Sequence, residues 1–156
     1  NAEAIRDEII SGAYWWHEPK TSAPLVIIYS GATAPEAQLA SNQVIDDLPD
    51  IGMLAVTSPD RLHHDWRTSE ESSHITNLLS KLSSTATLVT VIDGAPAALS
   101  WLGAVCGHRV VSLGVDSFGQ SGDIPDLYRA YGIDSEAIID ACARICMRGL
   151  ENKSAK

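Results

Sequence analysis

Four short hydrophobic runs divide the chain. They are PLVIIYSG at residues 24–31, GMLAVTS at 52–58, ATLVTVID at 86–93 and HRVVSLGV at 108–115. Each run is almost continuously apolar and rich in β-branched residues. It lacks the alternation of apolar and polar residues that is typical of strands with one solvent-exposed face. We therefore predict four strands that are covered on both faces.

The segments between these runs carry start signals for helices. Thr33 with Glu36 has the spacing of a capping box and predicts a helix that ends near Asp46. Thr68 with Glu71 has the same spacing and predicts that the segment SHITNLLSKL is helical. Helices are thus expected after the first and second strands.

Two further helices complete the pattern. The segment AALSWLGAVC follows the third strand, and the last helix is expected to begin at Asp134 or Ser135. Its apolar face would contain Ile138, Cys142, Ile145 and Cys146. Strand and helix alternate, which predicts a three-layer α/β/α fold on a mostly parallel sheet of about five strands. A fifth, short edge strand is compatible with the pattern, but no run fixes its place.

The length suits one compact domain. The chain has 156 residues, of which 45% are hydrophobic and 20% charged. We expect a single domain over residues 3–150, a tail over 151–156, and a remnant of a cleaved tag at residues 1–2, so that the chain would be cut from something larger.

The charge balance disfavours two classes of partner. Twenty acidic residues against 11 basic ones give a formal charge of −9, which repels nucleic acid and anionic lipid. The sequence has neither a signal peptide nor an apolar run of about 20 residues. We expect a cytoplasmic protein that binds neither nucleic acid nor membranes.

No motif predicts a catalytic, cofactor-binding or metal-binding residue. SGATAPE has neither the Walker nor the G-x-G-x-x-G spacing, and no G-x-S-x-G motif occurs. DRLHHDW is interpreted as a polar helical turn with Leu62 and Trp66 packed inward. Cys106, Cys142 and Cys146 are expected to be small buried hydrophobes rather than metal ligands.

Two segments are candidates for an interface. GAYWW places Tyr14, Trp15 and Trp16 in a row, and these aromatics either pack under the sheet or form a contact surface. The loop VDSFGQSG after the fourth strand turns at glycines, and there Asp116, Phe118 and Gly119 are the candidates. That loop is either a structural turn or a contact element.

The order of these segments resembles a known family. LGVDSFGQSG followed by IPDLYRAYGIDSEAIIDACARIC is similar to the C-terminal (third) domain of the transketolase-like, thiamine-diphosphate-dependent enzymes. AIRDEIISGAYWW and LAVTSPDRLHHDW most resemble the homodimeric pyruvate dehydrogenase E1 component, whereas LYRAYGIDSEAI matches transketolases equally well. The chain departs from the E1 pattern at Ile92, Asp93 and Gly94.

The resemblance implies a structural and assembly domain of a larger enzyme. In that family thiamine diphosphate and Mg2+ lie between the N-terminal and middle domains, where a Gly-Asp-Gly run supplies metal ligands, and this chain has no such run. The isolated domain is therefore expected to be inactive and to bind no cofactor. Its expected partners are the N-terminal and middle domains of the parent chain, a second copy in a homodimer, and an E2 acyltransferase.

One alternative belongs to another class. Open α/β sheets bind ligands at the carboxyl ends of their strands, at the point where the strand order reverses. A free-standing ligand-binding module would use Gly31, Asp93 and Gly114 in this way.

Overall fold

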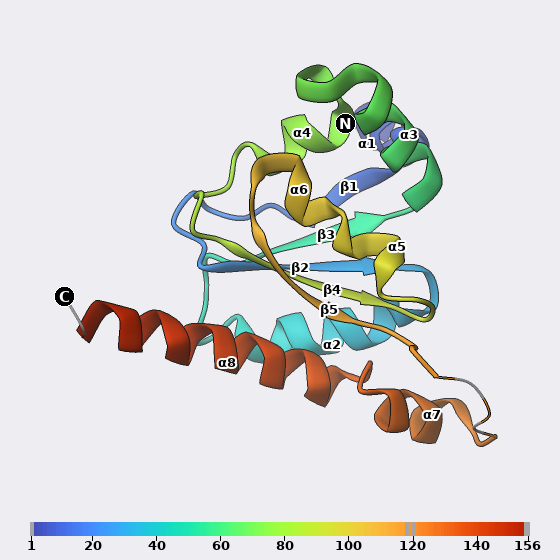
Figure 1. The fold of residues 1–156 in the computed structure, drawn as a ribbon, viewed down its shortest axis with the longest axis vertical. Coiled ribbons are helices and arrows are strands. Elements are labelled where there is room, and N and C mark those ends of the chain that lie inside the picture. Colours follow the sequence, from blue (N-terminus) through green and yellow to red (C-terminus); the bar gives the residue numbers. More distant parts are fainter. Residues whose placement is uncertain (1, 118, 120, 155–156) are drawn as a thin grey trace.

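The fold is known from a computed structural model that describes residues 2–117, 119 and 121–154. A five-stranded sheet lies between two layers of helices (Figure 1), as the sequence predicted. The strands are β1 (Ala13–His17), β2 (Leu25–Ser30), β3 (Gly52–Val56), β4 (Thr87–Ile92) and β5 (Arg109–Leu113). None of the helices within the described residues is long and apolar enough to span a bilayer.

The strand order is β1-β3-β2-β4-β5. β2 pairs in parallel with both β3 and β4, and β5 pairs in parallel with β4. Every residue of β2 and β3 is buried, which explains why their sequences are continuously apolar.

β1 is the fifth strand, which the sequence could not place. It runs antiparallel to β3, with Ala13 opposite Val56 and a register shift between Trp15 and His17. Gly12 precedes it with φ of 111°, a conformation that favours glycine. The aromatic segment therefore forms an edge strand of the sheet.

Helices cover both faces of the sheet (Figure 1). One face carries α2 (Ala34–Val44) and α8 (Ser135–Ser154), with α7 (Ile124–Tyr131) before α8. The other face carries the helices that follow β3 and β4. They are α3 (Pro59–Ser69), α4 (His74–Leu79), α5 (Ala97–Ser100) and α6 (Leu102–Cys106).

Three short elements complete the chain. α1 (Ala2–Ser11) leads into β1, the 3-10 helix η1 (Gly31–Thr33) precedes α2, and the 3-10 helix η2 (Glu70–Ser72) separates α3 from α4.

The first predicted capping box is wrong. The Thr33 hydroxyl donates to the carbonyl oxygens of Ser30, at 3.1 Å, and of Val91, at 3.3 Å, and does not cap α2. The Glu36 carboxylate instead accepts a hydrogen bond from the backbone N–H of Ser135 at 2.8 Å. Both side chains thus hold distant segments together, a role that local spacing does not reveal.

The second predicted capping box is also wrong. Thr68 lies inside α3, where its hydroxyl donates to the carbonyl oxygen of His64. α4 is capped by Ser73, whose side chain accepts from the N–H of Thr76 at 3.3 Å. The predicted start of the last helix is confirmed, because α8 begins at Ser135.

The sheet separates two hydrophobic cores. In β2, Leu25, Ile27 and Tyr29 belong to the core on the side of α2 and α8, whereas Val26 and Ile28 belong to the core on the side of α3 to α6. Successive side chains of a strand point to opposite faces, so β2 contributes to both cores.

The close packing of α6 against β5 gives a test of this architecture. A Cβ atom at Gly103 would lie 2.7 Å from the carbonyl oxygen of His108 and would overlap the side chain of Val110. Gly103→Ala should therefore lower the free energy of unfolding by about 1–3 kcal/mol, although alanine is the better helix former. Urea denaturation would measure the change.

Gly149→Ala is the matched control. Gly149 lies in α8, and a Cβ there would meet no atom within 4 Å. The same substitution should raise the free energy of unfolding there, by up to about 1 kcal/mol. Equal effects of the two substitutions would contradict the packing of α6 on β5.

Candidate functional site

The carboxyl ends of β2, β4 and β5 lie along one edge of the sheet. After β2 the chain turns to the face of α2, whereas after β4 it turns to the opposite face, so the strand order reverses between β2 and β4. Gly31, Asp93 and Gly114 directly follow these strands. The structure therefore brings them to one edge, as the ligand-binding alternative requires.

A hydrogen bond within the chain occupies the Asp93 carboxylate. The Tyr128 hydroxyl of α7 donates to it, with 3.1 Å between the oxygen atoms. Burial raises the pKa of Tyr128, and the hydrogen bond to Asp93 and the charges of Asp93 and Glu36 raise it further. Asp93 thus anchors α7 to the carboxyl end of β4.

The turn after β5 packs directly on the turn after β4. The N–H of Val115 donates to the carbonyl oxygen of Gly94 at 2.8 Å. A Cβ atom at Gly114 would lie 2.7 Å from the same oxygen and 2.8 Å from Cγ of Pro96. Gly114 is therefore needed for close approach of two backbone segments, which leaves no room for a ligand group between them.

The charges at this edge are negative. Asp93 and Asp116 follow two of the strands, and Glu36 is in the first turn of α2. Their carboxylates oppose the favourable effect that the α2 N-terminus would have on an anion. A phosphate group would be repelled here.

The three aromatic interface candidates have different environments. Tyr14 packs against the core on the side of α2, and Trp15 against the core on the side of α3. Burial, followed by the proximity of Tyr14, raises the pKa of Tyr29 to about 12. Trp16 is 54% exposed, so it is the member of the trio that remains free to contact another molecule.

The candidates after β5 lie at the far edge of the sheet. Asp116 and Gly119 are exposed, and Gly119 has φ of 107°. Phe118 lies outside the described residues. Because β1 and β5 are opposite edges, the two sets of candidates belong to separate surfaces.

α1 adds exposed apolar side chains that the sequence analysis missed. Ile5, Ile9 and Ile10 are 48%, 41% and 48% exposed. Ile5 and Ile9 are four residues apart, the spacing of neighbours on one helix face, and this signal could have identified the helix.

Leu62 and Trp66 of the histidine-containing segment pack inward, as the sequence predicted. Leu62 is fully buried, and Trp66 stacks on Trp101 with 5.3 Å between ring centroids. His63 packs edge-on against Trp101 at 4.8 Å. Within the described part of the chain, no group of three or more His, Cys, Asp or Glu residues is placed to hold a metal ion.

The cysteines are free thiols. Cys142 is buried, and its burial, with a smaller effect of Cys146, raises the pKa of Cys142 to about 12. Burial also raises the pKa of Cys106 and Cys146, both half-buried. The prediction of buried cysteines is confirmed for Cys142, whereas Cys106 and Cys146 are only half-buried.

Comparison with known proteins identifies the fold. No protein family model matches the chain, and no curated protein is similar to it in sequence. Among solved structures, it is similar to transketolase from Leishmania mexicana, with a TM-score of 0.69 and 18% identity over 91% of this chain. Transketolase from Campylobacter jejuni matches with a TM-score of 0.62 and 18% identity over 86% of this chain.

A split-gene transketolase, described as an inactive β4 tetramer, matches with a TM-score of 0.63 and 14% identity over 85% of this chain. The chain spans 41% of that protein, but only 19% and 18% of the Leishmania and Campylobacter transketolases. Identities this low establish the fold and nothing finer. The resemblance found in the sequence is thus confirmed as a shared α/β fold, that of one domain of a transketolase.

Proposed function

We propose that this chain is the C-terminal structural and assembly domain of a larger thiamine-diphosphate-dependent enzyme of the transketolase-like class. The observation that carries the proposal is the match of 91% of this chain to 19% of a transketolase. A match of that form is expected of one domain from a multidomain enzyme. The motif after β5 and the final helix pair, on which the sequence resemblance depends, support the same assignment.

The split-gene transketolase supports the expectation that the isolated chain is inactive. That protein is described as inactive in the form of a β4 tetramer, and it includes a region with the fold of this chain. A chain with this fold therefore need not be active by itself.

The charges at the carboxyl edge of the sheet support the absence of a cofactor site. Thiamine diphosphate carries a diphosphate group, and the carboxylates of Asp93, Asp116 and Glu36 at this edge would repel it. The sequence also lacks the Gly-Asp-Gly run that ligates Mg2+ in the family. The residues of this edge do not fit the cofactor, so we assign them no step of its chemistry.

Our narrower proposal is a parent of the pyruvate dehydrogenase E1 type, with a transketolase as the alternative. An E1 would decarboxylate a 2-oxo acid and transfer the acyl unit to a lipoyl group on an E2 partner, and its cofactor would supply the carbanion chemistry. We further propose that the parent is a cytoplasmic homodimer. This chain would contribute contact surface to that assembly.

The exposed apolar side chains near the N-terminus suit such contacts. Trp16 on β1 and Ile5, Ile9 and Ile10 on α1 are all more than two-fifths exposed. Large aromatic side chains are enriched at the centres of interfaces because their burial releases much ordered water. We propose Trp16 as the principal contact residue of this surface.

Calorimetric titration tests the absence of a cofactor site. Thiamine diphosphate with Mg2+, added to the isolated chain, should give only the heat of dilution, because the cofactor site would belong to other domains. The intact parent enzyme, titrated in the same way, is the positive control. Micromolar binding to the isolated chain would contradict the proposal.

Trp16→Ser tests the assembly role in two contexts. In the isolated chain, the substitution should change the free energy of unfolding by only about 0.5 kcal/mol, because Trp16 is 54% exposed. In the intact parent, dimer dissociation followed by sedimentation should become easier by about 2 kcal/mol or more, as at an interface hot spot.

Leu39→Ser provides the matched control, since Leu39 is 49% exposed and lies on α2. Leu39→Ser should change the free energy of unfolding of the isolated chain and the free energy of dimer dissociation of the parent by similarly small amounts. Small and equal effects of Trp16→Ser in both contexts would exclude Trp16 as a contact residue.

A further inference from the structure

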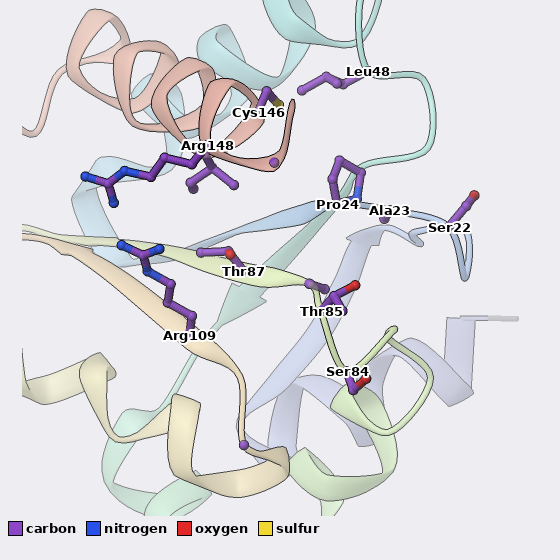
Figure 2. Close-up of a pocket in the computed structure, with 14 residues that line it drawn as sticks. Ser22, Ala23, Pro24, Leu48, Ser84, Thr85, Thr87, Arg109, Cys146 and Arg148 are labelled. Atoms are coloured by element: carbon purple, nitrogen blue, oxygen red, sulfur yellow. The ribbon is translucent and has the colours of Figure 1, made fainter. Parts of the chain in front are cut away.

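A cavity of about 930 Å³ opens at the amino ends of β2, β4 and β5 (Figure 2). This is the edge of the sheet opposite to Asp93 and Gly114. Leu25, Thr87 and Arg109 begin the three strands, and α8 contributes Ile145, Cys146, Arg148 and Gly149 to the wall. Nothing in the proposed function uses this cavity.

Two arginines distinguish this cavity from the opposite edge. Arg109 begins β5 and Arg148 belongs to α8, and Figure 2 shows the two side chains extending along the same side of the cavity. No carboxylate belongs to the lining residues that the structure describes. The whole chain has a net charge of −9, whereas the charged residues that line this cavity are both cationic.

Neither guanidinium has an ion-pair partner among the described residues. The ion pairs found there involve Lys20, Lys81 and Arg129. Two cations that share one cavity repel each other unless an anion lies between them. No described carboxylate therefore neutralises Arg109 or Arg148, and both can contact an anion from outside the chain.

The rest of the lining is mixed. Ser84 and Thr85 contribute hydroxyl groups, whereas Pro24, Leu48 and Ile145 contribute apolar surface. An anionic group could contact the arginines while an apolar group of the same molecule lies against the hydrophobic wall. Sites of this kind, with mostly apolar walls and a few polar anchors, are typical of small-molecule binding.

We propose that this cavity binds a small organic anion, with a phosphate or carboxylate head held by Arg109 and Arg148 and an apolar body against Pro24, Leu48 and Ile145. The guanidinium group donates paired hydrogen bonds to either type of head. The proposal does not depend on the assignment of the chain to a thiamine-diphosphate enzyme.

Titration of the isotope-labelled chain, followed by NMR, tests the proposal. The probes are phenyl phosphate and benzoate, with benzyl alcohol as the uncharged analogue. At least one anion should shift the amide signals of Thr87, Arg109 and Arg148, and benzyl alcohol should bind at least about ten-fold more weakly. The stronger of the two anions identifies the preferred head group.

Substitutions then locate the site. Arg109→Gln and Arg148→Gln should each weaken binding about ten-fold or more, because each removes a charged hydrogen-bond donor. Arg67→Gln makes the same change in charge on α3, which does not line the cavity, and should alter binding less than about two-fold. Arg109→Lys should restore part of the lost affinity, which a merely unfolded variant would not.

Three results would overturn the proposal. They are the absence of binding by both anions, equal binding of benzyl alcohol and the anions, and binding that is unchanged in both glutamine variants. Both arginines are exposed, so the circular dichroism spectra of the variants should match that of the original chain.

Discussion

Burial of the sheet on both faces is the constraint on which the rest of the structure depends. β2 lies at the centre and sends alternate side chains into two separate cores, so neither helical layer can be removed without exposing apolar surface. The faces are thereby closed to other molecules. The edge strands β1 and β5 and the two ends of the strands are not covered in this way.

The two ends of the strands differ in charge and in packing. At the carboxyl ends, Asp93 holds Tyr128 and the turn at Gly114 packs on Gly94, so this edge is acidic and filled by the chain itself. At the amino ends, Arg109 and Arg148 line an open cavity that contains no described carboxylate. This polarity opposes the usual use of an open α/β sheet, in which ligands bind at the carboxyl ends. It agrees with our proposal that the cofactor site of a larger enzyme would lie in other domains.

The sequence predicted the parts of the fold that depend on continuous burial. β2, β3 and β4 were found because strands covered on both faces are almost continuously apolar, and α8 was found from its periodic face. β5 is also a strand, but the prediction that it is covered on both faces is wrong, because it is an edge strand with half-buried or exposed residues. Both capping boxes failed because Thr33 and Glu36 bond to segments far away in the sequence, and Thr68 bonds within α3. β1 was missed because its apolar run is short and contains aromatic residues in place of the β-branched residues that mark the other strands. The cavity could not be foreseen, since Arg109 and Arg148 are brought together only by the packing of α8 on the sheet.

The central claim is that the chain is one domain of a larger assembly, which it contacts through α1 and β1. Amide hydrogen exchange, compared between the isolated chain and the intact parent enzyme, tests this most directly. Exchange in residues 5–17 should be slower in the parent, because contact would exclude water from α1 and from the free edge of β1, while exchange in β2 and β4 should stay equally slow in both. Identical exchange of residues 5–17 in the two states would contradict the claim.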